Sequence, residues 1–443
     1  MFSSAVPPIR RVSSLGRSLA VGVLLFVGLS LWNATPAHAY AWMIRHDYSA
    51  CGTCHADPSG GELLTQYGRV TAQLLLASQY GSPDAPSKEA TPKSEGSGGA
   101  SKSAELEGPK PGLFWGAVNL PDALLLSGSY RNLYLLQPSE DQVFTFVPVM
   151  QADLYGRLRL GPVTMGGSVG IAKVSPGSEH SLAAQVTHAP AGKVNMISRT
   201  HYVGVDLGTE FLMRLGRLNL PFGVRIPEHT AWVRESTRTD RESDQQHGLA
   251  LSYVGENLRG EVMAIAGNYQ TSLTPAGQYA DLSRDAVRER GYALYLEGIG
   301  SPTFATGISS KVTYARLDRI TNEEETVRQA HGMTMRWGPA EEFSILAEMD
   351  VLFRSNATAG YVGFTQADYE PWGGLHFLLT GEVVDNGRTN DDPEDVAPGR
   401  GNPKFGGWVG VDWFFYKQFE LRVDAVFRQT EGPTIMGQLH MYL

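Results

Sequence analysis

Apolar and polar side chains alternate with a period of two along most of the chain, from about residue 112 to the end. In residues 343–354, for example, Met349 and Val351 alternate with the acidic Glu348 and Asp350. This period is that of a β-strand with one apolar face and one charged face. The same alternation recurs in residues 144–160 and 419–428.

The alternating segments run to about ten residues or more, which is the length that a tilted strand needs to cross a membrane. Their connections alternate between tight turns and long polar stretches, as in outer-membrane barrels. The pattern predicts an all-β fold, a transmembrane antiparallel β-barrel of about sixteen strands in residues 112–443, with both ends on the periplasmic side. A soluble sandwich or a pair of solenoids would also alternate, but the charged face and the aromatic strand ends favour a barrel. Tight turns are expected at 161–162, 208–209, 256–257, 300–302, 338–339, 371–372 and 417–418.

Three regions of different composition precede the barrel. Residues 1–39 have the basic start, apolar stretch and small-residue cleavage motif of an export signal. Residues 40–81 form a small segment that we expect to be helical. Residues 82–111 are rich in Ser, Gly, Pro and Lys, which is typical of a flexible linker. Such a linker spans roughly 30 Å as a coil, so the small segment is expected to hang in the periplasm and to meet the barrel mouth only transiently.

Cys51, Cys54 and His55 have the spacing C-x-x-C-H, the attachment signature of c-type haem. Two thiols at this spacing can each add to a haem vinyl group, and the histidine then ligates the iron. The chain has 2 cysteines in all, so a redox dithiol or a zinc site would compete for the same pair. Zinc needs two further ligands, and no second Cys/His cluster follows. The sequence therefore predicts one covalent haem c per chain on Cys51 and Cys54, with His55 on the iron.

The sixth iron ligand has two candidates within residues 40–111. They are Met43 and His46, since after His55 the next histidine is His180. We favour His46, because a neutral imidazole binds both oxidation states of iron, whereas methionine raises the reduction potential. A solvent-exposed His46 with a five-coordinate iron, or a ligand from another chain, is the alternative.

Two resemblances follow from these residues. The segment around Cys51, Cys54 and His55 resembles the monohaem c-type cytochrome modules of exported bacterial proteins. The later part is similar to the porin-like β-barrels of Gram-negative outer membranes, which carry glycine, proline and phenylalanine runs where a strand enters a long loop. The residues that carry the first resemblance include Pro58, Leu64, Tyr67, Gly68 and Arg69, and those that carry the second are Gly216, Arg217, Pro221, Phe222, Gly223 and Arg225.

The charged face of the predicted strands carries both signs, and a barrel of about sixteen strands is wide enough for an aqueous lumen. Opposite charges across that lumen would produce a transverse field, as in diffusion pores. Alternatively, the charges pair with one another and fill the space. Residues 225–241 are rich in both signs. They are expected either to fold inward as a constriction or to form a solvated outer loop.

The formal net charge of −9 argues against a nucleic-acid partner. We find no hydrolase or P-loop signature, so a transport or electron-transfer protein is favoured over an enzyme. The sequence predicts an outer-membrane porin-like protein whose periplasmic haem transfers electrons to or from a periplasmic or outer-membrane cytochrome. The alternatives are a diffusion porin for small solutes whose haem senses redox state or gates entry, and a peroxidase-like haem enzyme. Outer-membrane lipid is an expected partner, and a homo-oligomer is left open.

Overall fold

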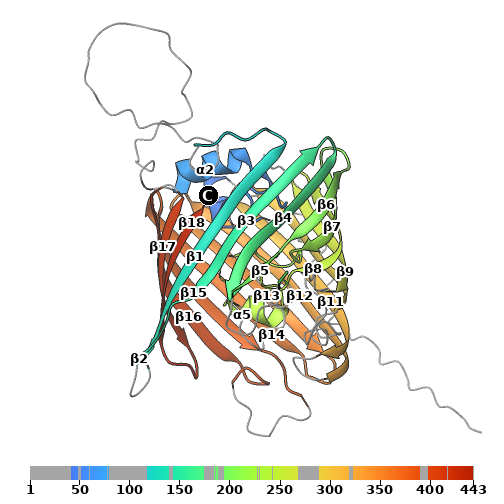
Figure 1. Cartoon of the computed structure of the whole chain (residues 1–443). Helices are drawn as coiled ribbons and strands as arrows, with labels where there is room; N and C mark the ends of the chain where they lie inside the picture. The colour runs from blue at the N-terminus through green and yellow to red at the C-terminus, as the bar shows by residue number, and fades with distance from the viewer. Residues whose placement is uncertain are drawn as a thin grey trace, which may run out of the picture.

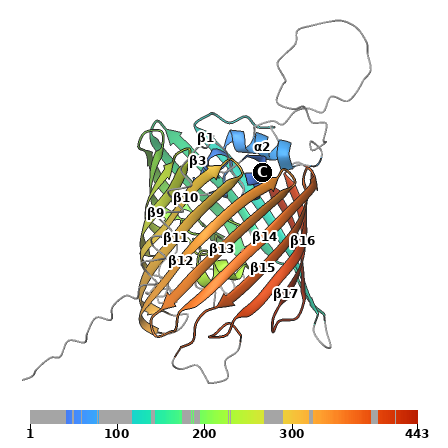
Figure 2. The same cartoon turned by 180° about the vertical axis from the view of Figure 1, so that it is seen from behind.

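The computed structural model shows one closed antiparallel β-barrel (Figures 1 and 2). It describes residues 41–78, 117–389 and 398–442, apart from 48–50, 59, 77, 139–142, 174–183, 185, 188–193, 227, 229, 242, 268–288, 319–322 and 417. The predicted export signal and linker lie outside these residues. No helix among the described residues is long and apolar enough to span a membrane.

The barrel strands follow one another around the wall in chain order. They are β1 (Leu124–Pro138), β2 (Val143–Phe146), β3 (Val149–Leu160), β4 (Val163–Lys173), β5 (Val194–Ile197), β6 (His201–Asp206), β7 (Phe211–Leu218), β8 (Gln246–Val254), β9 (Leu258–Gly267), β10 (Arg290–Ser301), β11 (Phe304–Asp318), β12 (Glu323–Ala340), β13 (Phe343–Arg354), β14 (Gly360–Trp372), β15 (Leu375–Asp385), β16 (Lys404–Tyr416), β17 (Phe419–Arg428) and β18 (Thr434–Tyr442).

The eighteen labelled strands occupy sixteen positions in the wall, because two positions are each shared by two consecutive strands. β2 and β3 both pair with β1, and β5 and β6 both pair with β4. Pairing of β1 with β18 closes the barrel, with Ser129 opposite Tyr442. The predicted closed barrel of about sixteen strands is therefore confirmed.

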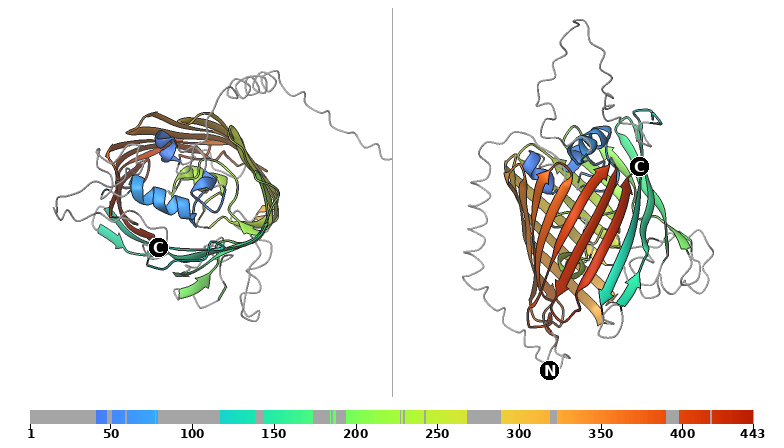
Figure 3. Two further views of the ribbon diagram at one scale, coloured as in Figure 1. Left: turned by 90° about the horizontal axis from the view of Figure 1, so that it is seen from above. Right: turned by 90° about the vertical axis from the view of Figure 1, so that its left-hand side faces the viewer.

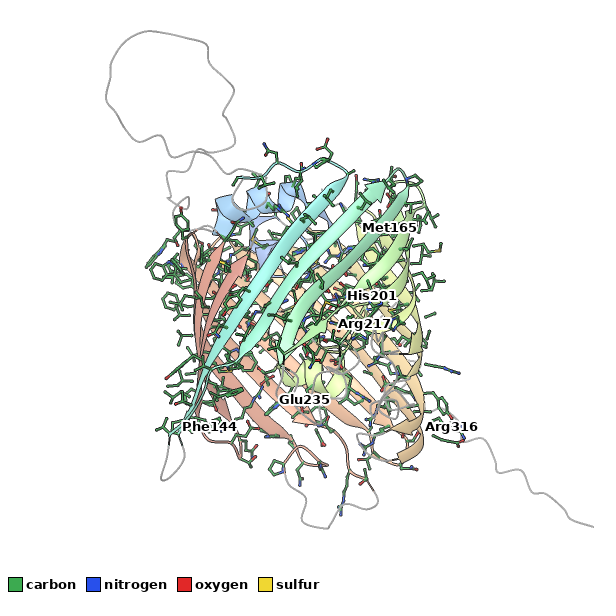
Figure 4. The ribbon with its side chains drawn as sticks, viewed as in Figure 1. Phe144, Met165, His201, Arg217, Glu235 and Arg316 are labelled. Atoms are coloured by element: carbon green, nitrogen blue, oxygen red, sulfur yellow. The ribbon has the colours of Figure 1, made fainter. Side chains whose placement is uncertain are left out.

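Side-chain polarity in the wall is the reverse of that in a soluble protein. On β13, Glu348 and Asp350 are 2% and 0% exposed, whereas Met349 and Phe353 are 48% and 43% exposed. The charged face therefore points into the barrel and the apolar face points out. Figure 4 labels Phe144 of β2, one of the large apolar side chains that are exposed.

The interior charges mostly pair with neighbours on the same wall. Glu297 of β10 contacts both Arg259 and Arg336, the latter at 2.8 Å between Nε and Oε1. Arg422 and Asp424 of β17 pair at 2.8 Å. These pairs match the alternative in which interior charges neutralise one another, rather than facing each other across an open lumen.

The tight turns lie near the predicted positions, with two differences. β12 and β14 continue past Pro339 and Pro371, and the pairing register shifts at both places. A proline cannot donate to the ladder, so it is accommodated where the pairing is irregular. Among the aromatic residues expected at the strand ends, Trp408 and Phe414 are buried instead of facing outward.

The long connection between β7 and β8, residues 219–245, folds into the barrel. We call it the inward loop, and it contains the short helix α5 (Trp232–Thr237). Its backbone donates to three strands of the wall. Gly223 N bonds Ser309 Oγ at 2.8 Å, Val224 N bonds Glu348 Oε2 at 2.8 Å and Trp232 N bonds Glu382 Oε1 at 2.6 Å. The inward constriction considered for residues 225–241 is therefore the observed arrangement, and the solvated outer loop is not.

Residues 41–78, which we call the N-terminal segment, lie inside one end of the barrel (Figure 3). They form η1 (Trp42–His46), η2 (Cys51–Thr53) and α2 (Gln66–Leu76). This end, which we call the mouth, has the short turns, and Tyr442 N near the C-terminus bonds Gln418 O there at 2.9 Å. The segment does not hang free of the barrel as the sequence predicted, because buried contacts described below fix it to the wall.

Candidate functional site

The C-x-x-C-H motif forms a compact turn under helix α2. His55 N bonds Cys51 O at 3.0 Å, and Thr65 N bonds Cys54 O at 2.7 Å. Gly68 on α2 lies so close to the motif that a Cβ there would come within 2.2 Å of Cys54 O. The absence of a side chain at residue 68 therefore lets the helix pack directly on the motif.

The His55 side chain is buried and oriented by one backbone group. Its Nδ1 lies 3.0 Å from Gly61 O. A carbonyl oxygen only accepts, so Nδ1 carries the hydrogen and Nε2 is the nitrogen suited to bind a metal. Burial, followed by the positive charge of Arg241, lowers the pKa of His55 to about 4. The imidazole is therefore neutral at physiological pH, which is the form that ligates iron.

The two cysteines differ in exposure. Cys51 is half-buried and lines the interior cavity, whereas Cys54 is buried. Burial, followed by the neighbouring Cys51, raises the pKa of Cys54 to about 12, so its sulfur is a neutral thiol rather than a metal-binding thiolate. Among the described residues, no group of three or more His, Cys, Asp and Glu could hold a bare metal ion. This donor set fits covalent haem attachment better than it fits zinc.

A large cavity adjoins the motif, with an empty volume of about 1810 Å³ that includes solvent-filled space. Three parts of the chain line it, namely the N-terminal segment, the inward loop and the wall, chiefly β1, β3 and β14–β18. The residues of the first two parts that carry the chemistry are Cys51, His55, Arg69, Arg225, Arg234 and Arg241. The part of the cavity that a water molecule can occupy is about 180 Å³, which is below the 300–1,000 Å³ typical of small-molecule sites, so side chains fill much of the space around the motif.

Buried polar contacts anchor the N-terminal segment to the wall and to the start of the inward loop. Asp57 Oδ1 lies 3.1 Å from Arg214 Nη1 on β7. Glu62 accepts from Thr200 Oγ1 at 2.9 Å and from Asn219 Nδ2 at 3.1 Å. These contacts place the motif at a fixed position against the barrel.

The inward loop contacts the motif directly. Arg241 Nη2 donates to Gly60 O at 2.6 Å, and a Cβ on Gly61 would overlap the same guanidinium. Gly61 also provides the carbonyl that orients His55. The predicted iron ligand and the constriction are therefore joined through one two-residue turn.

The structure does not bring the two candidate sixth ligands to the cavity that His55 lines. His46 Nε2 lies 3.1 Å from Glu370 Oε2 on β14, and Met43 packs with Leu76 and Phe414. Neither is among the residues that line the cavity. The ligation of iron by His46 that the sequence led us to expect would require His46 to leave Glu370.

Sequence reasoning did not connect Arg45 or Arg241 with the C-x-x-C-H motif. Both contact residues far away in the chain. Arg45, for example, contacts Asp368, which is 323 positions later. The available signal was the run of glycines at 60–61 beside the motif and the excess of charge in residues 225–241.

No protein-family model matches the chain, and no curated protein matches it. Among solved structures, a loop-deletion mutant of OmpT, an outer membrane protein of Vibrio cholerae, is 11% identical with a TM-score of 0.51, over 72% of this chain and 99% of that one. Salmonella typhi OmpF, solved with daunomycin, is also 11% identical with a TM-score of 0.51, over 72% of this chain and 97% of that one. At such identities the likeness concerns the fold alone. The chain shares its closed barrel fold with these outer-membrane proteins.

Proposed function

We propose that this protein is a porin-like outer-membrane barrel that carries a c-type haem in its periplasmic mouth, and that the haem senses redox state and gates the entry of small solutes. The observation that carries the proposal is the 2.6 Å hydrogen bond from Arg241 of the inward loop to Gly60 O. It joins the constriction to the turn that holds the proposed iron ligand.

Insertion in the outer membrane is supported by the apolar outer face of the barrel. Large hydrophobic side chains are exposed around the wall, including Leu215, Leu379, Val409 and Phe427. Exposure of so much apolar surface needs a lipid environment. The predicted export signal and the short turns at the mouth support a periplasmic orientation for that end.

The residues have distinct roles in this proposal. Cys51 and Cys54 would hold haem by thioether bonds, and His55 would ligate the iron through Nε2. When bound, the haem supplies a one-electron redox couple. Gly61 O keeps the His55 tautomer fixed, while Arg241 places a positive charge beside the imidazole. Oxidation would add a positive charge at the iron, and the positive charge of Arg241 would oppose it. Reduction of the iron would be favoured by the same residue of the inward loop.

Conductance in planar bilayers tests the proposal directly. The conductance of the full-length protein is measured twice, once with a soluble redox mediator that keeps the haem oxidised and once with one that keeps it reduced. We expect two different conductances for the wild type and a single one for the Cys51→Ser, Cys54→Ser variant. Equal conductance in both redox states of the wild type would contradict gating by the haem.

Electron transfer at the outer membrane is the second candidate, and the position of the N-terminal segment favours it. A haem on a free tether could not bridge a hydrocarbon core of order 25 Å. Attachment at Cys51 would instead place the haem within the barrel, against the cavity that Cys51 lines. A partner cytochrome or external donor would still have to complete the path.

Proteoliposomes separate the two candidates. A reduced cytochrome is enclosed in the vesicles, and a membrane-impermeant electron acceptor is added outside. Oxidation of the enclosed cytochrome that needs Cys51 and Cys54 would favour electron transfer. Redox-dependent leakage of a small enclosed solute, without such oxidation, would favour gating.

A further inference from the structure

Arginines outnumber carboxylates in the lining of the large cavity, by seven to five. Several of these arginines have a carboxylate partner. Arg199 pairs with Asp153 at 2.9 Å, Arg422 pairs with Glu228 at 2.7 Å, and Arg234 contacts Glu348. The inward loop supplies two further arginines, Arg225 and Arg241, which contact backbone carbonyls instead of carboxylates.

Arg225 and Arg241 bond backbone carbonyls rather than carboxylates. Arg225 Nη2 donates to Leu220 O at 2.8 Å, and Arg241 Nη2 donates to Gly60 O at 2.6 Å. Neither forms an ion pair within the part of the chain that the structure describes. The Nη1 of Arg225 is buried and has no hydrogen-bond partner there. A buried donor of this kind is costly unless a ligand satisfies it.

The two guanidinium groups also repel each other. Burial is the main cause that lowers the pKa of Arg225, to about 10, and the charge of Arg241 is the next. Arg225 is therefore still charged at neutral pH. The charges of Asp57 and Glu261 act on Arg225, and the charge of Glu62 acts on Arg241, but neither guanidinium is ion-paired with these carboxylates. An anion bound directly between the two would stabilise both, and the fork of a guanidinium matches a carboxylate in geometry.

The pair lies beside the proposed haem attachment site. Arg225 lines both cavities that Cys51 lines. Arg241 contacts the Gly60–Gly61 turn that orients His55. A haem attached at Cys51 and Cys54 carries two propionate groups, which are carboxylates that a protein must either solvate or neutralise.

We propose that Arg225 and Arg241 form a carboxylate-binding site in the mouth, and that the carboxylate it holds is a propionate of the haem attached to Cys51 and Cys54. This assignment rests on the haem attachment proposed above. A free carboxylate solute has the same chemistry and is the other source. The N-terminal segment would then attach the haem, and the inward loop of the barrel would bind one of its propionates.

The first arm of the test measures the reduction potential of the haem in the full-length protein. Arg225→Gln and Arg241→Gln each remove a cation that would neutralise a propionate, so the reduced state becomes less favourable. We expect at least a tenfold fall in the reduced-to-oxidised ratio at fixed applied potential, which is about 59 mV for one electron. The control is Arg159→Gln, which removes an exposed arginine that is paired with Asp206 at 2.7 Å.

The second arm uses succinate as the probe and needs no haem. The Cys51→Ser, Cys54→Ser protein is titrated with succinate by calorimetry, with and without Arg225→Gln. If a propionate fills the site, the haem-free protein binds succinate through Arg225 and the haem-loaded protein does not. If the source is a free solute, both bind succinate and the reduction potential is unchanged by either arginine variant.

The proposal is overturned if the potential is unchanged and no succinate binds, or if Arg159→Gln shifts the potential as much as the others do. Haem staining of the denatured wild type shows whether haem is attached at all. It therefore separates failure of the carboxylate site from failure of the proposed function. An unstained wild type would refute haem attachment, and the succinate arm would still report on the site. Arg225→Lys keeps the charge without the fork, and replaces Arg225→Gln if that variant does not fold.

Discussion

The guanidinium of Arg45 in the N-terminal segment lies 2.6 Å from the carboxylate of Glu370 on β14, measured between Nη2 and Oε2. Its Nη1 contacts Asp368 Oδ2 at 2.9 Å, and all three side chains are buried. Gly338 provides the space, since a Cβ there would come within 2.4 Å of Arg45 Cα. Arg69 of α2 contacts Leu126 O on β1, so the N-terminal segment is fixed to two separate parts of the wall, β14 and β1.

We predict that Arg45→Met releases the N-terminal segment from the mouth. It leaves Asp368 and Glu370 buried without their cation, which costs about 3–5 kcal/mol. Proteolytic cleavage of the segment should accelerate by more than about a hundredfold under conditions in which opening is fast. The rate is measured on the folded protein in detergent, with intact barrel migration on unheated gels as the check on folding.

Arg159→Met is the matched control for that variant. Its pair with Asp206 is as short, at 2.7 Å, but the Arg159 side chain is 58% exposed. Exposed pairs contribute about 0–1 kcal/mol, so cleavage should be close to the wild-type rate. Equally faster cleavage of the N-terminal segment in both variants would show that the contact of Arg45 with Asp368 and Glu370 does not hold the segment in place.

We predict that the denatured wild-type protein keeps a haem stain on gels and that the Cys51→Ser, Cys54→Ser variant loses it. Thioether bonds survive denaturation, whereas axial ligation does not. His55→Ala is the control, because it should keep the stain while changing the visible spectrum of the folded protein. A stain of equal strength in the double serine variant would refute covalent attachment.

We predict that His46→Ala leaves the visible spectrum of the haem unchanged, because His46 contacts Glu370 at 3.1 Å and does not line the cavity next to His55. Absorption spectra of both oxidation states, with and without carbon monoxide, provide the measurement. Conversion from a low-spin to a high-spin spectrum would instead show that His46 reaches the iron, as the sequence led us to expect.

We predict that Gly223→Ala displaces the inward loop and raises the conductance. Gly223 has a φ of +65°, and a Cβ there would come within 2.1 Å of Glu348 Oε1. The cost should be about 1–3 kcal/mol from strain and overlap together. Single-channel recording measures the effect, and an unchanged conductance would mean that the loop does not limit passage.

Gly161→Ala separates backbone strain from overlap in that comparison. Gly161 has a similar φ of +62°, but nothing lies within 4 Å of the position that a Cβ would take at this tight turn. The substitution should cost about 1–2 kcal/mol from backbone conformation alone and should not change conductance.

The barrel could be predicted from the sequence because its pattern is local. Alternation such as that of Glu348, Met349 and Asp350 decides which face each residue takes, and neighbouring strands follow in chain order. The ends of strands were less accurate, since Pro339 and Pro371 look like turn residues but lie where the pairing register shifts inside β12 and β14.

The position of the N-terminal segment could not be predicted in this way. Arg45 precedes His46 in a short polar stretch that resembles an exposed surface, and its partners lie on strands near the other end of the chain. The composition of residues 82–111 suggested a free tether, but a long connection is equally compatible with a docked segment. The docking becomes visible only in the structure, where the interior carboxylates Asp368 and Glu370 of β14 pair with Arg45.

The burial of Cys54 imposes an order on biogenesis. Once α2 covers the motif and Gly68 lies against Cys54 O, an enzyme that joins haem to the thiols has no access to this cysteine. The wall residues that hold the segment, such as Glu370, are synthesised long after it. Haem attachment as proposed therefore has to take place while the exported chain is still open, and the last strands then enclose a finished cofactor.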